Sequence, residues 1–157
     1  MGKTINEDIL KFFQAQGYVI VSTIDKGGSV HNACKGIIEI NRGGKAYLLD
    51  LYHGETFKNL SENPSVSVTA IDEHKFKGYS LQGKAKIVTA DELKDHLLKA
   101  WEEKITSRIT RRLIKNLYGE KGHPKHPEAL LPNPKYMIAV DIEAVVDLTP
   151  HHIKQEA

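Results

Sequence analysis

Residues 18–51 read YVIVSTIDKGGSVHNACKGIIEINRGGKAYLLDL, and this stretch contains three apolar runs separated by two glycine-rich turns. The runs, at 18–24, 29–40 and 45–51, are rich in the β-branched and aromatic residues that favour strands. The turns DKGG and NRGG between them are short enough to join antiparallel neighbours. The stretch therefore predicts three consecutive antiparallel strands.

Three more strands are expected along the chain. Residues 65–71 alternate with period two, residues 79–88 do so more loosely, and residues 136–148 are rich in isoleucine, valine and alanine. Gly83 lies inside the second of these segments, where a bulge or a sharp bend is expected. Because closure removes exposed strand edges, the six strands predict a mainly β fold built as a closed or nearly closed barrel.

Helices are expected to flank this barrel. Thr4 and Glu7 have the spacing of a capping box, which predicts a helix over about 5–16. A short helix is expected over 56–63, where Pro64 stops it. The first of these helices precedes the strands, and the second separates the third strand from the fourth.

The longest helical segment precedes the last strand. Thr89 and Glu92 offer a second capping box, and this predicts a helical excursion over about 90–119 that is either one helix or two broken near Thr106 and Ser107. Apolar residues recur there at near-helical spacing, which points to core packing for the side that they share: Leu93, Leu97, Trp101, Ile105, Ile109 and Leu113.

The composition fits one domain over residues 1–157, with a loose tail from about residue 150. Lys and Arg number 22 against 20 Asp and Glu, so the net charge of +2 gives no global attraction to nucleic acid or membranes. Cys34 is the only cysteine, which excludes an intrachain disulfide, and it is expected to be buried and inert. No apolar run approaches the ~18–20 residues that span a bilayer. We therefore expect a cytoplasmic protein without a metal site and without a nucleic-acid or membrane partner.

Four segments share a pattern in their order and spacing: DKGGSVHNACKG at 25–36, AYLLD at 46–50, TFKNLSENP at 56–64 and GYSLQGKA at 78–85. Together they resemble the FMN-binding split-barrel family related to pyridoxamine 5′-phosphate oxidase. The resemblance covers about half of the chain, and the helical region 90–135 contains no segment that matches. Cys34 stands where many members of the family have proline.

The resemblance implies a six-stranded antiparallel split β-barrel, homodimeric, with one FMN per subunit at the subunit interface. It also implies a flavin-dependent oxidoreductase that takes electrons from a reduced nicotinamide and acts on a small-molecule substrate. It assigns no catalytic acid or base. The cofactor-binding positions that it implies are Ala33, Cys34, Lys35, Gly36, Asp50, Leu51, Tyr52, His53, Gly54, Glu55, Thr56, Lys58 and Asn59.

The phosphate of FMN needs hydrogen-bond donors and positive potential, and a helix N-terminus supplies both, with roughly half a positive charge. Thr56 stands near the start of the predicted short helix, where it either contacts the phosphate or serves only as an N-cap. Members of the family often have a basic residue just before this threonine, whereas this chain has Glu55, which should point away. Lys35 or Lys58 must then supply the charge, and Lys35 is favoured because its strand runs along the flavin in the family.

The ring of the flavin is expected beside residues 33–36. Gly36 has no side chain and would permit a close approach to the ring. Asp50 and Asn59 match family positions, but they are equally suited to hydrogen bonds that hold the loop together.

Two other functions remain open on the same fold: a non-enzymatic carrier of flavin or haem, and a deazaflavin-dependent reductase. Among the eight histidines, His31 would be the candidate haem ligand, because it lies on the strand proposed to face the flavin. Residues 104–125 carry seven basic residues against one acidic residue. This basic segment is either a solvated surface or a binding site for a phosphorylated substrate, a nicotinamide dinucleotide phosphate or nucleic acid.

Overall fold

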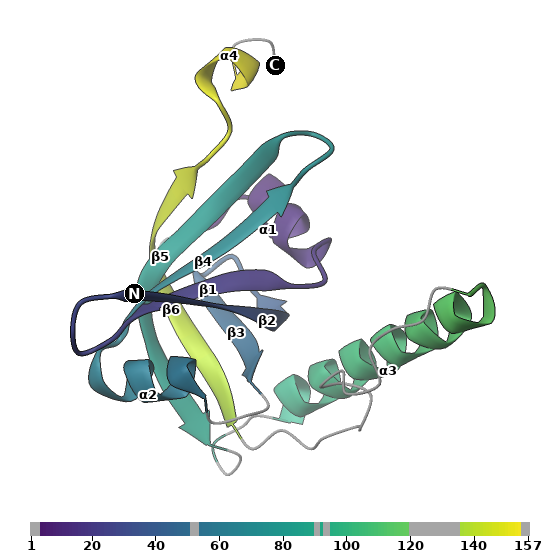
Figure 1. Cartoon of the computed structure of the whole chain (residues 1–157), viewed down its shortest axis with the longest axis horizontal. Coiled ribbons are helices and arrows are strands. Elements are labelled where there is room, and N and C mark those ends of the chain that lie inside the picture. The colour runs from purple at the N-terminus through teal and green to yellow at the C-terminus, as the bar shows by residue number, and fades with distance from the viewer. Residues whose placement is uncertain (1–3, 51–53, 90–91, 93–94, 120–135, 155–157) are drawn as a thin grey trace.

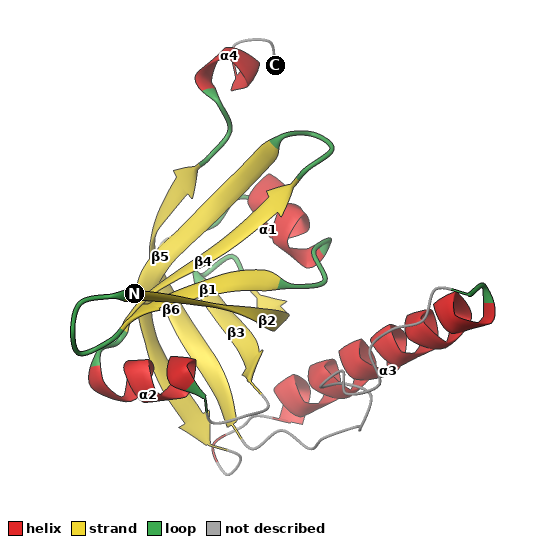
Figure 2. Cartoon of the chain, viewed as in Figure 1, coloured by secondary structure: helices red, strands yellow, loops and turns green. Residues whose placement is uncertain are grey.

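The computed structural model describes residues 4–50, 54–89, 92, 95–119 and 136–154. Six antiparallel strands form a closed barrel in the order β1-β2-β3-β6-β5-β4 (Figure 1). The predicted mainly β fold with flanking helices is therefore confirmed (Figure 2). The strands are β1 (Val19–Ile24), β2 (Val30–Ile40), β3 (Lys45–Asp50), β4 (Ser65–Asp72), β5 (Lys77–Thr89) and β6 (Tyr136–Asp147), and the helices are α1 (Glu7–Gln14), α2 (Glu55–Glu62), α3 (Asp95–Leu117) and α4 (His151–Lys154).

Strands β5 and β6 form the longest pairing of the barrel, and it contains the bulge expected at Gly83. The register shifts between Gln82 and Gly83, where the backbone of β6 comes unusually close. A Cβ atom at Gly83 would lie 1.9 Å from the carbonyl oxygen of Asp141, so no side chain fits at this position. Glycine is required here by the close approach of two backbones.

The barrel interior is filled by apolar side chains from alternate positions of the strands, and one helix covers each end. Helix α1 buries Leu10 and Phe13 at the end where β3 begins. Its N-cap is Asn6, whose Oδ1 accepts a hydrogen bond from Ile9 N at 2.9 Å. The predicted capping box at Thr4 and Glu7 is therefore wrong, because the nearer Asn6 side chain satisfies the same free amides.

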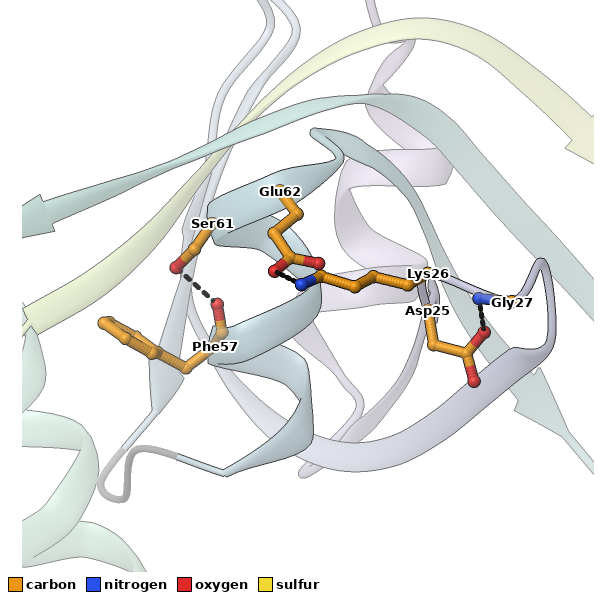
Figure 3. Close-up of polar contacts among 6 residues, drawn as sticks. All are labelled: Asp25, Lys26, Gly27, Phe57, Ser61 and Glu62. Atoms are coloured by element: carbon orange, nitrogen blue, oxygen red, sulfur yellow. Dashed lines mark hydrogen bonds and ion pairs between the residues drawn. The ribbon is translucent and has the colours of Figure 1, made fainter.

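Helix α2 covers the opposite barrel end, where β1 and β3 finish. Asn59 Nδ2 donates to Thr23 Oγ1 at 3.1 Å, which joins the helix to the inside of β1. The turn between β1 and β2 lies against the outer side of the same helix, where Lys26 Nζ is 3.1 Å from Glu62 Oε1 (Figure 3). These contacts fix α2 between the barrel interior and the first hairpin.

Helix α3 is one continuous helix that lies outside the barrel and extends beyond it (Figure 1). Its first turns pack on β2, β3 and β6, and Trp101 is buried there, so its predicted core packing is confirmed. Leu113 is 59% exposed because the barrel ends before the helix does. The second predicted capping box does not begin the helix: Thr89 Oγ1 donates to Glu92, but Thr89 still belongs to β5 and α3 begins at Asp95.

After β6, the segment that was predicted to be loose contains the single turn α4. No helix in the described ranges combines the length and the apolar character that crossing a membrane requires.

Candidate functional site

The first turn of α2 carries a buried hydroxyl that has no partner. The N-cap position belongs to Gly54, which has no side chain, so no side chain caps the first amides of the helix. Thr56 stands two residues after Gly54 and is 1% exposed, and among the described residues its Oγ1 makes no hydrogen bond. The interpretation of Thr56 as an N-cap alone is therefore wrong, since it is a buried helical residue. Leaving a buried hydroxyl unpaired costs about 1–3 kcal/mol, so this turn is a candidate position for a hydrogen-bond acceptor.

A polar network fills the barrel end beneath this turn. Lys35 Nζ donates to Asp50 Oδ1 at 2.7 Å, and Tyr136 Oη donates to Asp50 Oδ2. Asp50 is 2% exposed and the Lys35 side chain 16% exposed, so the ion pair lies within the protein. The ring of Phe57 meets the ring of Tyr136 edge-on, with centroids 5.0 Å apart. The N-terminal turn of α2 thus rests directly on the Lys35–Asp50–Tyr136 network.

This network holds the tyrosine in its protonated form. Burial, together with the hydrogen bond to the Asp50 carboxylate and its negative charge, raises the pKa of the Tyr136 hydroxyl above its ordinary value. The hydroxyl therefore remains a donor to Asp50 at neutral pH. With one cation and one anion paired, the barrel end is close to electrically neutral.

The structure distributes residues 33–36 over both faces of β2. Lys35 pairs with Val19, and Ala33 with Val21; both valines lie in the barrel core, so Ala33 and Lys35 face inward. Cys34 and Gly36 occupy the alternate positions and face outward. The four residues that were predicted to contact the flavin ring thus lie on one strand but on its two opposite faces.

The two outward-facing residues, Cys34 and Gly36, have different surroundings. Cys34 is exposed, which corrects the expectation of a buried thiol: it lies opposite Ile20, on a part of the sheet that no helix covers. Gly36 is buried beneath α3, where an added Cβ would lie 2.6 Å from Arg108 Nη1. The space that glycine leaves open is thus occupied by a guanidinium group. Arg108 also donates to the carbonyl of Gly17 at 2.7 Å.

The remaining predicted positions are placed as follows. Glu55 is exposed, and Lys58 is exposed one turn along α2. Asn59 is buried and bound to Thr23, so it holds the helix to the barrel. Leu51, Tyr52 and His53 lie outside the described residues.

His31 faces inward opposite Thr23, near the α2 end of the barrel, and is partly buried. Within the described residues, no three histidine, cysteine, aspartate or glutamate side chains come together in a way that would hold a metal ion.

Two residues that bear on the site were not foreseen. Tyr136 contacts Asp50 across 86 residues of sequence, and Arg108 reaches Gly17 across 91. Tyr136 offered no local signal, because only barrel closure brings β6 beside β3. Arg108 stood in the basic segment, but its burial could not be inferred from that charge pattern.

The outer face of the sheet away from α3 is uncharged along two rows of side chains. The strand registers place Cys34, Ile20, Thr69, Ser80 and Val146 in one row, and Asn32, Ser22, Ser67, Gln82 and Ala144 in the next. Several of the hydroxyls already bond to one another: Ser67 Oγ lies 2.7 Å from Ser80 Oγ, and Thr69 Oγ1 lies 3.2 Å from it. A groove of about 400 Å³ crosses the second row, and its lining also includes Lys84 and Glu143. Such a face loses little hydration energy when it is covered.

Comparisons with solved structures agree on the fold. A protein of the pyridoxinephosphate oxidase family from Clostridium acetobutylicum is 15% identical, with a TM-score of 0.54 over 95% of this chain and 99% of that one. HutZ, the haem storage protein of Vibrio cholerae, is 17% identical, with a TM-score of 0.53 over 91% and 94%. An F420 reductase is 14% identical, with a TM-score of 0.58 over 90% and 98%. At these identities the likeness establishes the fold alone.

Sequence comparison is more specific. No curated protein matches the chain. The pyridoxamine 5′-phosphate oxidase family, however, matches residues 5–145, which include the barrel, α2 and the Lys35–Asp50–Tyr136 network. The chain therefore belongs to the pyridoxamine 5′-phosphate oxidase family.

Proposed function

We propose that this protein binds FMN, with the phosphate at the N-terminal turn of α2, and that it is a flavin-dependent oxidoreductase. The observation that carries the proposal is the buried Thr56 hydroxyl, which has no partner among the described residues and lies in a turn whose amides have no side-chain cap. A phosphate oxygen would accept from that hydroxyl and from the amides at once.

The charge of the phosphate must be met by more than the helix. Lys35 is already paired with the buried Asp50, so its positive charge is largely balanced. Lys58 is exposed and has no ion-pair partner among the described residues. The helix dipole and Lys58 would therefore balance the charge of the phosphate, and Lys35 would hold Asp50 in place beneath the turn.

The chain's own groups would bind and orient the cofactor. FMN supplies hydride or electron transfer when it is bound, with a reduced nicotinamide as the proposed donor in the cytoplasm. The backbone of residues 33–36 would run beside the ring. Tyr136 and Asp50 hold the barrel end in one arrangement. Neither residue is proposed to transfer a proton.

A second copy of the chain is proposed to cover the uncharged outer face of β1, β2, β4, β5 and β6, with FMN at the seam. The absence of charge along its two described rows, together with the mutual hydrogen bonds of Ser67, Thr69 and Ser80, makes burial of this face inexpensive. The exposed Ile20 would supply apolar contact at the centre of the seam.

Haem is the second candidate ligand, and one observation favours it. HutZ, which shares the fold, is a haem storage protein, and His31 lies partly buried at the α2 end of the barrel. The F420 reductase likewise makes a deazaflavin a third candidate. In each case the ring would have to be accommodated at the same barrel end or seam.

The deciding experiment is purification followed by absorbance scanning and mass spectrometry of the released cofactor. Flavin bands with FMN mass support the proposal, whereas a Soret band or a deazaflavin mass would replace it. Stopped-flow reduction with NADH and NADPH then separates an enzyme, which is reduced rapidly and reoxidised by an acceptor, from a carrier, which is inert.

The site itself is tested by titrating FMN into Thr56→Ala. Loss of the hydroxyl should weaken binding by about tenfold, equivalent to ~1–1.5 kcal/mol of hydrogen bonding. Glu55→Lys should tighten binding, because it places a cation beside the phosphate. Ser61→Ala is the matched control: this hydroxyl of the same helix donates to Phe57 O at 2.8 Å, away from the N-terminal turn. Unchanged affinity in Thr56→Ala would remove this residue from the site.

The dimer is tested by placing a charge on the uncharged face. Ser67→Arg should convert a dimer into a monomer in analytical ultracentrifugation and should weaken FMN binding at the same time. Lys75→Ala, in the exposed turn between β4 and β5, should leave both unchanged. A wild-type chain that sediments as a monomer at all concentrations would contradict the dimer.

A further inference from the structure

A second groove lies on the other side of the molecule, where the end of α1 meets the middle of α3. It has a volume of about 290 Å³ and is open to solvent. Residues 14–17 form one wall, and the second wall is the side of α3 that carries Lys104, Ser107, Arg108 and Arg111. This α1–α3 groove shares no lining residue with the first turn of α2.

Three cations from successive turns of α3 line the groove, and one carboxylate, Glu103, accompanies them. Arg108 is buried and held in place by the carbonyl of Gly17 and by the ring of Tyr18, whose centroid is 5.1 Å from Cζ. Lys104 and Arg111 have no carboxylate partner in the part of the chain that the structure describes; Arg111 reaches only Ser107 Oγ, at 3.4 Å. Two of the three cations of the groove therefore have no carboxylate partner among the described residues.

The pKa of Lys104 reflects its position among these cations. Burial, and then the positive charges of Arg108 and Arg111, lower the pKa of the Lys104 ammonium below its ordinary value. The cations repel one another despite the presence of Glu103. A solvated basic surface would not need a concave wall or a buried arginine, so the groove is better suited to hold an anion than to face water alone.

We propose that the α1–α3 groove binds the phosphate group of a phosphorylated small molecule. Arg108 connects the groove to the strand proposed to run along the flavin, because its guanidinium lies over Gly36. The identity of the phosphorylated molecule rests on the proposed flavin function. If that function holds, the phosphate is the 2′-phosphate of NADPH, and the groove selects NADPH over NADH.

The anion site is tested on the full chain in the presence of excess FMN, so that the phosphate site proposed at α2 is not available, by isothermal titration with inorganic pyrophosphate at low ionic strength. Lys104→Gln and Arg111→Gln should each weaken binding by about tenfold, as expected when one charge-assisted hydrogen bond is lost. Glu103→Gln should tighten binding severalfold, because it removes the one anion of the groove. Lys115→Gln is the matched control: this exposed lysine on the same helix does not line the groove, and its loss should change affinity less than twofold.

Two results would overturn the anion site: no binding of pyrophosphate by the wild-type chain, or an equal loss in Lys115→Gln, which would indicate a long polyanion such as nucleic acid lying along the helix. The source of the phosphate is tested separately by titrating NADPH and NADH into the FMN-loaded chain. Tighter binding of NADPH that Lys104→Gln abolishes supports NADPH, and equal binding of the two overturns that assignment. Failure to bind FMN, with pyrophosphate binding intact, would contradict the proposed function and leave the anion site standing.

Discussion

The α2 end of the barrel and the α1–α3 groove handle charge in opposite ways. At the barrel end, the cation Lys35 and the anion Asp50 are paired with each other, and what lacks a partner is the neutral hydroxyl of Thr56. In the groove, Lys104 and Arg111 lie close together without a described carboxylate partner. The contrast separates a region that lacks a hydrogen-bond acceptor from a region that lacks anionic partners.

Solvent exposure explains the contrast. Asp50 is 2% exposed, and a buried charge without a partner costs several kcal/mol, so the barrel end tolerates ions only as a pair. The groove is open to solvent, so its cations remain unpaired at a smaller cost, although burial still lowers the pKa of Lys104. Mutations at the two regions should therefore differ sharply in their effect on stability.

The largest effect is expected for Asp50→Ala. It leaves the Lys35 ammonium buried without its carboxylate and Tyr136 without its acceptor, and it should lower the free energy of unfolding by about 3–5 kcal/mol. The matched control is Asp141→Ala, which breaks the pair between Lys45 and Asp141 at 2.6 Å on a half-exposed surface. That change should cost no more than about 1 kcal/mol. Equal losses in urea denaturation would contradict the assignment of Asp50 to a buried network.

Tyr136→Phe should have a smaller effect that depends on pH. Removing the hydroxyl leaves one oxygen of the buried carboxylate unpaired, at a cost of about 1.5–3 kcal/mol near neutral pH. Because the pKa of Tyr136 is raised on folding, its contribution is fully present below ~10, the ordinary tyrosine pKa, and is lost as the pH rises above that value. The stability difference between wild type and Tyr136→Phe should therefore shrink in denaturation at alkaline pH. A difference that stays constant up to the onset of alkaline unfolding would argue against this network.

The smallest effect is expected for Lys104→Gln. The pKa of this lysine is lowered on folding, so its charged form is disfavoured in the folded chain, and removing the charge should leave stability within about 0.5 kcal/mol or raise it. Thermal unfolding measures this, with Lys115→Gln as the control on the same helix. A loss comparable to that of Asp50→Ala would show that Lys104 has a structural partner, and the contrast between the two regions would then fail.

The local elements were predictable because their signals are local. The three strands within residues 18–51 follow from apolar runs and glycine turns, and the bulge at Gly83 from a glycine inside a strand pattern. The short helix α2 followed from the segment 56–63 and the proline that ends it. The boundaries were less predictable: Asn6 caps α1 in place of Thr4, because neighbouring polar side chains compete for the same amides.

The amino-acid sequence alone determined the six strand segments in their succession along the chain, the resemblance to the family and the position of the α2 turn, since each is carried by residues that lie close together in the sequence. Only the tertiary structure decided which faces are covered: that Cys34 lies open, that Gly36 lies under Arg108, and that Tyr136 closes on Asp50. Alternation along a strand separates two faces but does not say which of them faces the interior or a helix. That distinction arises only when the barrel closes and brings together residues that are far apart in the sequence.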